Sequence, residues 1–206
     1  MPDKSKNPRK APTRSGGVAT VHAIVEATRI LVQRERGTDT VTVAKIAKVA
    51  GVSVASVYQF FPTKEAVIAA CMEAELGRKA EAFAHEALAM HAARVPLDEA
   101  VPALTVQSLR MIRELFRDMP LPRDMARMSV RETLYARSAE LLQGMLLVRA
   151  EDDPRVRGKD IATLARVVAR AVTDLGESAV DDDDATFETF ARETSRMITR
   201  YVLTPD

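Results

Sequence analysis

The chain has 206 residues, a formal net charge of +1 and a composition that is 47% hydrophobic and 29% charged. This length fits one medium domain or two small ones that share a core, and the composition is typical of a soluble globular protein. We find no signal peptide and no apolar run of about 18 residues, so we expect a cytoplasmic protein that does not enter a membrane. The single cysteine, Cys71, excludes an intrachain disulfide, and we expect it to be a buried apolar residue.

The charge is unevenly spread along the chain. Residues 1–70 hold 11 Lys and Arg against 5 Asp and Glu, a net +6, whereas residues 71–206 hold the remaining 19 and 24, a net −5. A basic first third suggests an anionic partner for that part of the chain, although solvated faces also produce such an imbalance.

Apolar residues recur with helical spacing and nowhere alternate convincingly, which predicts an all-α fold of about nine helices. Residues 1–17 contain three prolines, two glycines and five basic residues, so we expect a disordered basic arm that could contact phosphate or a minor groove. Helices are then expected at about 18–36, 43–50, 54–61 and 63–91. Gly37 ends the first of these, and Thr63 caps the fourth.

Four further segments are predicted to be helical, at about 97–118, 123–152, 159–180 and 184–203, and a break near Ser129 would divide the second and bring the total to nine. The acidic run at 181–184 is expected to connect and cap the final helix rather than to bind metal, because no further ligands are signalled. We expect no cofactor and no metal site. We expect a division of the chain after residue 64, into a first part at 18–64 and a second part at 65–206.

Residues 42–64, TVAKIAKVAGVSVASVYQFFPTK, have the layout of a helix-turn-helix. Ala47 is small enough for the point where two helices cross, Gly51 suits a turn with positive φ, and Val57 packs back into the crevice. Ser53 is placed to cap the second helix.

The N-terminal turn of the second helix is expected to enter the major groove with Val54, Ala55 and Ser56. Valine and alanine contact thymine methyl groups rather than donate to base edges. Contacts to phosphate are expected from Lys45, Lys48, Tyr58, Gln59 and Lys64.

The first third of the chain closely resembles the tetracycline-repressor (TetR) family of transcriptional regulators. The resemblance rests on Ile24, Ala27, Leu31 and Gly37, on Thr42-Val43, Ile46-Ala47, Ala50-Gly51-Val52-Ser53 and Val57-Tyr58, and on Phe61-Pro62-Thr63-Lys64-Glu65. It implies DNA contacts at Thr42, Ala44, Lys45, the start of the second helix, Tyr58 and Lys64. Ala44 departs from the polar residue that some relatives carry there, and Phe60 stands where many carry His or Tyr. These departures shorten the list of base-reading side chains.

The resemblance also implies two domains, a DNA-binding domain at 18–64 and a regulatory domain at 65–206. The regulatory domain is expected to bind a small, largely apolar effector and to form a homodimer on a palindromic operator. The candidates for the ligand pocket are Phe83, Met90, Met111, Leu115, Phe116, Met128, Tyr135 and Met145. The last two helices carry long apolar stripes that need a partner, and the candidates for the dimer interface are Ile161, Leu164, Val168, Val172, Phe187, Phe190 and Ile198.

Three classes of function are therefore weighed. The favoured hypothesis is a ligand-responsive homodimeric repressor, with an activator of the same family as the alternative. A helical enzyme is disfavoured because His85 and His91 lie six residues apart and do not share a helix face. An interaction module that does not bind DNA is disfavoured by the basic arm, Tyr58 and Lys64.

Overall fold

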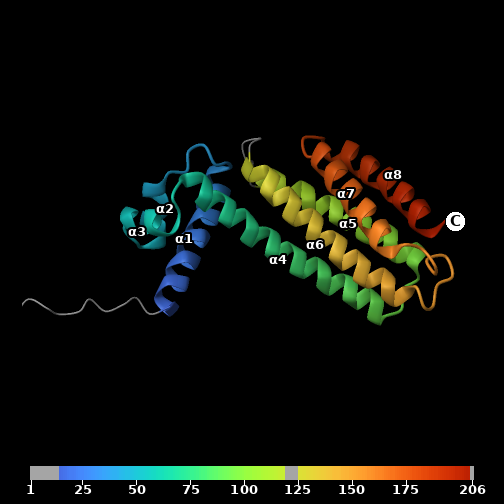
Figure 1. Ribbon diagram of the computed structural model, residues 1–206. Coiled ribbons are helices and arrows are strands. Elements are labelled where there is room, and N and C mark those ends of the chain that lie inside the picture. The colour runs from blue at the N-terminus through green and yellow to red at the C-terminus, as the bar shows by residue number, and fades with distance from the viewer. Residues whose placement is uncertain (1–13, 119–124, 205–206) are drawn as a thin grey trace, which may run out of the picture.

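The computed structural model describes residues 14–118 and 125–204, which form eight α-helices and no strand (Figure 1). The all-α prediction is confirmed. The helices are α1 (Arg14–Glu35), α2 (Val43–Ala50), α3 (Val54–Phe60), α4 (Lys64–Ala92), α5 (Leu97–Asp118), α6 (Met125–Arg149), α7 (Ile161–Ser178) and α8 (Asp184–Leu203).

A small N-terminal domain is built from α1, α2, α3 and the first turns of α4. Its core is aliphatic, with fully buried Ile24, Leu31, Ile46 and Val57. The start of α4 joins this core through buried Val67, Ile68 and Cys71, which form one continuous apolar cluster with the others. The domain is therefore held by the same long helix that leads into the rest of the chain.

The larger C-terminal domain is a bundle of helices in three layers, seen along its length in Figure 1. The body of α4 packs on α5 and α6, and these two are covered on their other side by α8 and α7, respectively. The layers bury Leu109, Ile112, Leu134 and Phe187 almost completely. None of the described helices is both long enough and apolar enough to cross a membrane.

Two expectations about helix boundaries are wrong. First, α1 begins at Arg14, so residues 14–17 are helical and do not belong to a disordered arm, and the rest of that arm lies outside the described residues. Second, α6 continues through Ser129 without a break, which leaves eight helices in the described ranges rather than nine. A serine, unlike a proline, keeps its backbone N–H and so does not by itself end a helix.

The first turns of α1 are held by α3. A Cβ placed on Gly17 would lie 3.8 Å from the Phe60 ring, so the ring packs closely against this part of α1. Phe60 is half-buried and belongs to the packing around the core. Phe60, which stands where many relatives carry His or Tyr, therefore packs within the domain against α1.

Candidate DNA-binding surface and regulatory pocket

The turn between α2 and α3 has the geometry that the spacing predicted. Gly51 adopts a left-handed conformation with φ 69°, which a residue with a side chain rarely adopts. The backbone N–H of Val52 donates to the carbonyl of Ala47 at 3.0 Å, closing the end of α2. Ala47 and Val57 are buried at the contact between the two helices. The roles predicted for Ala47, Gly51 and Val57 are confirmed.

Hydroxyl side chains cap three successive helices. The Thr42 hydroxyl accepts from the Lys45 N–H at 3.3 Å, the Ser53 hydroxyl from the Ser56 N–H at 3.0 Å, and the Thr63 hydroxyl from the Ala66 N–H at 3.1 Å. Each cap satisfies a backbone donor that the helix leaves free, and it typically contributes about 1 kcal/mol. These caps set where α2, α3 and α4 begin, and so set the angle between them.

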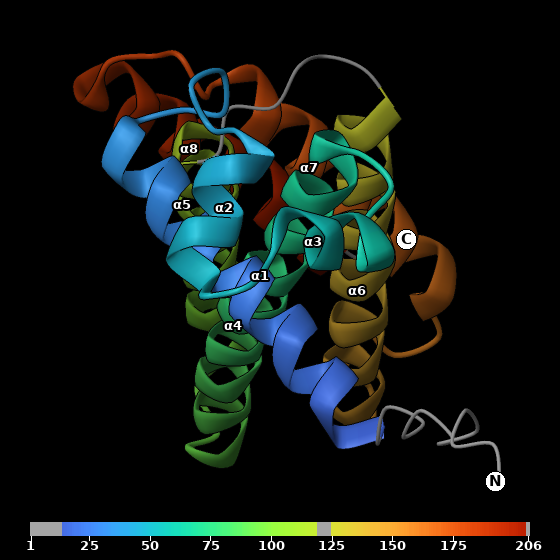
Figure 2. The same cartoon turned by 90° about the vertical axis from the view of Figure 1, so that its left-hand side faces the viewer.

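The outer face of α3 is exposed and faces the viewer in Figure 2. Val54 and Tyr58 expose 42% and 53% of their surface, large fractions for apolar and aromatic residues. Ser56 is half-buried, and its hydroxyl lies 2.8 Å from that of Ser53. The predicted base-reading and phosphate-contacting residues that lie exposed on or beside this face are Thr42, Ala44, Ser53, Val54, Ala55, Tyr58 and Gln59.

Two of the three remaining predicted phosphate contacts, Lys45 and Lys64, have partners within the domain. The Lys45 ammonium lies 3.0 Å from the Glu35 carboxylate and 2.8 Å from the Thr40 carbonyl oxygen. The Lys64 ammonium donates to the Thr38 carbonyl oxygen at 3.2 Å. Both lysines thus tie α2 and α4 to the connection that follows α1. An ion pair near the surface, such as that of Lys45 with Glu35, contributes little to stability, so exchanging Glu35 for a phosphate is feasible.

Glu35, the last residue of α1, accepts hydrogen bonds from both Thr40 and Lys45. The Thr40 hydroxyl and then the Lys45 ammonium hold the pKa of the Glu35 carboxyl below its usual value. The carboxylate is therefore ionised at neutral pH and offsets part of the positive charge on this side of the domain. Lys48, in contrast, is exposed in the last turn of α2 and adds to that charge.

The C-terminal domain contains an apolar pocket. Its lining atoms leave about 860 Å³ of space, including solvent at the mouth, of which the centre of a water-sized molecule can occupy about 80 Å³. The small second volume means that the free space between the lining side chains is narrow. The lining residues are Phe83, Ala87, Met90, His91, Leu97, Ala100, Val101, Leu104, Thr105, Ser108, Ser138, Leu141, Leu142, Met145, Leu146, Arg149, Val168, Ala169, Val172, Ile198 and Val202.

Three of the eight predicted pocket residues line this space, namely Phe83, Met90 and Met145. Leu115 and Phe116 are buried in the core elsewhere, and Met111 is half-buried against it. Tyr135 instead lies against α7, with the Arg170 guanidinium 5.2 Å from its ring centre. Met128 lies outside the residues whose side chains the structure describes. Helical spacing identifies an inward face but does not say which part of that face is left unfilled.

The predicted dimer-interface residues face inward. Ile161, Leu164, Val168, Val172, Phe187 and Ile198 each expose between 1% and 8% of their surface in the single chain, and Phe190 is half-buried. Three of them, Val168, Val172 and Ile198, line the pocket. The apolar stripes of α7 and α8 are accounted for by packing on α6 and α5, so these buried residues leave almost no surface for a second subunit.

Sequence reasoning missed the polar residues of the pocket. His91, Ser108, Ser138 and Arg149 line it, and His91 is the only one of the three histidines that does so. Ser108 and Ser138 interrupt inward-facing apolar stripes, which is a signal that the sequence contains. Arg149 carries no such signal, because a basic residue in the last turn of a helix is common. In the described ranges no group of three or more His, Cys, Asp or Glu could hold a metal ion.

The helix-turn-helix has a counterpart among known proteins. Residues 20–71 match the profile described as "Bacterial regulatory proteins, tetR family". These residues form a tetR-family domain. The match extends from α1 to the buried Cys71 in α4, and so includes the whole helix-turn-helix and its support. A search of curated proteins finds no match to the chain.

Solved structures share the fold along almost the whole chain. A transcriptional regulator from Cytophaga hutchinsonii has a TM-score of 0.68 at 14% identity, over 89% of this chain and 97% of that one. The RolR protein in complex with its ligand resorcinol has a TM-score of 0.68 at 17% identity, over 94% and 99%. A putative TetR-family regulator from Mesorhizobium loti has a TM-score of 0.62 at 16% identity, over 90% and 96%. The helical domain that follows the tetR-family domain thus belongs to the same overall fold.

Proposed function

We propose that the protein is a homodimeric transcriptional repressor that binds a palindromic operator and is released from it by a small molecule. One observation carries the proposal: α4 belongs to both candidate sites. Its first turns bury Val67 and Ile68 in the core of the tetR-family domain, and its last turns present Phe83, Met90 and His91 to the pocket.

The two ends of α4 are mechanically linked. From Lys64 to Phe83 the helix rises by about 29 Å at about 1.5 Å per residue, without a proline or other break. A ligand that displaces the pocket-lining part of α4 therefore also shifts its capped start beside α3. Release from DNA requires that the ligand bind the displaced arrangement more tightly than the DNA-binding arrangement.

The pocket suits a small-molecule effector. It is lined mostly by aliphatic side chains from five helices, with a few polar groups that can orient a ligand. The structurally similar RolR protein was solved with resorcinol bound, which supports small-molecule binding by this fold.

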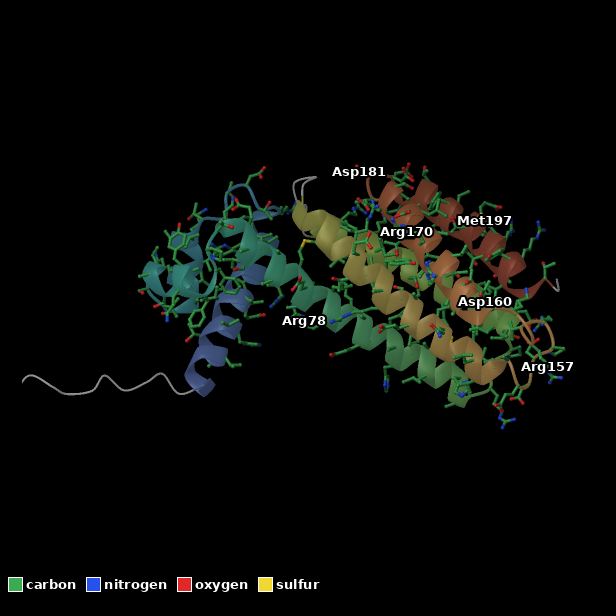
Figure 3. The ribbon with its side chains drawn as sticks, viewed as in Figure 1. Arg78, Arg157, Asp160, Arg170, Asp181 and Met197 are labelled. Atoms are coloured by element: carbon green, nitrogen blue, oxygen red, sulfur yellow. The ribbon has the colours of Figure 1, made fainter. Side chains whose placement is uncertain are left out.

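A second subunit is proposed on the outer face of α7 and α8, away from α4. Val167, Met197 and Tyr201 expose 45%, 50% and 48% of their surface there, and Met197 is labelled on α8 in Figure 3. A two-fold dimer matches two half-sites about 34–36 Å apart, one turn of the duplex. Sedimentation should give a monomer for Met197→Arg but a dimer for Val148→Arg, a matched change at an exposed position of α6. A dimer of unchanged affinity in Met197→Arg would place the interface elsewhere.

DNA binding is tested by selecting bound duplexes from a random library and measuring affinity for them by fluorescence anisotropy. The protein is expected to prefer an inverted repeat over random duplex. Tyr58→Phe removes one hydroxyl from the exposed face of α3 and should weaken binding, whereas Tyr135→Phe makes the same change on α6 and should not. Equal affinity for selected and random duplexes, even at low salt, would contradict the proposal. Transcription in vitro from a promoter with the selected site then separates a repressor from an activator.

A further inference from the structure

The pocket is a slot with a cationic end. Its lining on α6 extends from Ser138 to Arg149, eleven residues apart, and on α5 from Leu97 to Ser108, the same separation. Each span corresponds to about 16 Å of helix rise at about 1.5 Å per residue. Because the space is also narrow, its natural occupant is an extended rather than a compact molecule.

The walls between the two ends are aliphatic. The Thr105 hydroxyl, which lies along them, donates to the Val101 carbonyl oxygen at 2.8 Å, so its hydrogen is already used. The remaining wall residues offer only carbon and sulfur, and they favour an unbranched apolar chain over a polar one. They are Phe83, Ala87, Met90, Ala100, Leu104, Leu142, Met145 and Val172.

Arg149 lines the slot at its end beside the connection between α4 and α5. Its guanidinium donates to the Val95 carbonyl oxygen in the connection between α4 and α5, which places it beside His91 at the end of α4. Arg149 also lines a shallow outer depression with Arg94, Asp152, Asp153 and Arg155. The side chain is half-buried and therefore lies where the apolar slot meets the surface.

The Arg149 guanidinium forms no ion pair with a carboxylate among the described residues. Asp152 and Asp153 follow it closely in sequence, and its positive charge adds to that of Arg155 in lowering the Asp153 pKa. The Asp153 carboxylate instead accepts from Arg155 at 3.0 and 2.8 Å, and Arg155 holds the Asp153 pKa below its usual value. Arg149 thus keeps donors that the protein itself does not use.

From this arrangement we infer that the effector is a slender amphipathic carboxylate, with its carboxylate on Arg149 and its chain along the slot. That an effector exists rests on the proposed function, and the inference adds the chemical class of that effector. A planar guanidinium matches a carboxylate with two parallel hydrogen bonds, and the position near solvent avoids burying the charge fully. The apolar chain then displaces water from the aliphatic walls.

Calorimetric titration of the 206-residue protein with decanoate, decan-1-ol and methyl decanoate tests this inference. Each probe is used below the concentration at which it aggregates. The three probes share one chain and differ in head group. Wild type should bind decanoate at least about tenfold more tightly than the other two, the usual scale for a hydrogen bond to a charged group. Arg149→Met should bind all three alike, and Arg149→Lys should keep part of the preference.

Arg157→Met is the matched control. Arg157 is exposed at the same end of the bundle, donates to the Glu151 carbonyl oxygen and does not line the pocket (Figure 3). This variant should keep the full preference for decanoate, and thermal melts should show that every variant is folded. A wild type without preference for the acid, a preference that survives in Arg149→Met, or no binding of any probe would overturn the inference.

Operator binding measured in the same samples separates the two proposals. A protein that binds its selected operator and is released by another compound, but does not bind decanoate, would overturn only the ligand class. A protein that binds decanoate through Arg149 but shows no preference for any duplex would overturn the repressor proposal and leave the ligand class standing.

Discussion

Gly176 of α7 packs directly on Ile112 of α5. A Cβ at position 176 would lie 3.0 Å from Ile112 Cγ2 and 3.2 Å from its Cβ, closer than side chains normally approach. Ile112 is buried and its Cβ is fixed to the helix backbone, so it cannot move aside without moving α5. The close approach of α5 and α7 therefore depends on this glycine.

Gly176→Ala is expected to destabilise the protein by about 1–2 kcal/mol, because overpacking costs about 1–3 kcal/mol and alanine's higher helix propensity returns up to about 1 kcal/mol. Gly144→Ala on α6 is the control, since a Cβ there meets nothing within 4 Å. That change should stabilise by about 0.5–1 kcal/mol. Chemical denaturation at one protein concentration measures both. A stabilised Gly176→Ala would mean that the two helices separate freely.

Ser53 has a capping role that can be separated from its position on the DNA-facing surface. Ser53→Ala should cost about 1 kcal/mol of stability and weaken DNA binding, because the Ser56 N–H loses its acceptor. Ser53→Asp should preserve stability, since aspartate also caps, but should weaken DNA binding further through repulsion of phosphate. Thermal melts and anisotropy together check this. If Ser53→Asp binds DNA as tightly as wild type, the start of α3 does not approach the duplex.

Lys48 is predicted to contact phosphate. Lys48→Ala should weaken binding to all duplexes similarly and should reduce the slope of log affinity against log salt by about one per contact, hence about two for a dimer. Lys79→Ala is the comparison, because the Lys79 ammonium lies 2.8 Å from Glu114 in the regulatory domain. Its slope should equal that of wild type. An unchanged slope for Lys48→Ala would remove this residue from the interface.

Cys71 reports on the opening of the domain junction. Burial, with a smaller contribution from Glu75, raises the pKa of its thiol to about 12, so the folded protein holds it protonated at pH 8. Since the thiolate is the reactive form, labelling with a thiol reagent should be very slow in the native protein and should accelerate on denaturation. Labelling kinetics followed by mass spectrometry give the rate. Native labelling as fast as that of a free thiol would show that α4 separates readily from α1.

Asp183 should make the free energy of unfolding depend on pH below about pH 4. The Thr186 hydroxyl and the backbone N–H groups at the start of α8 hold the Asp183 pKa below its usual value of about 3.9. The stabilisation is therefore present above about pH 4 and is lost as pH falls through the lowered pKa of the folded state. Asp183→Ala should lower the melting temperature at pH 7 and show less further loss on acidification. Asp181→Ala, which removes an exposed neighbour, should behave as wild type.

The local features of the tetR-family domain follow directly from short stretches of sequence. Caps at Thr42, Ser53 and Thr63, the left-handed Gly51 and the small Ala47 all act within a few residues of their partners, so their spacing is enough to predict them. The acidic run before α8 also behaved as predicted, with Asp183 as its cap.

Which inward faces of the helices meet, and where a gap remains between them, depends on how the helices pack in three dimensions. The apolar stripes of α7 and α8 need to be buried, but their spacing does not tell whether a neighbouring helix or a second subunit buries them. In this structure α5 and α6 bury them. The pocket is a gap between five helices, so its polar end at Arg149 depends on the register of α6 against the connection after α4. Such registers follow from the packing of whole helices and leave no mark at a single position in the sequence.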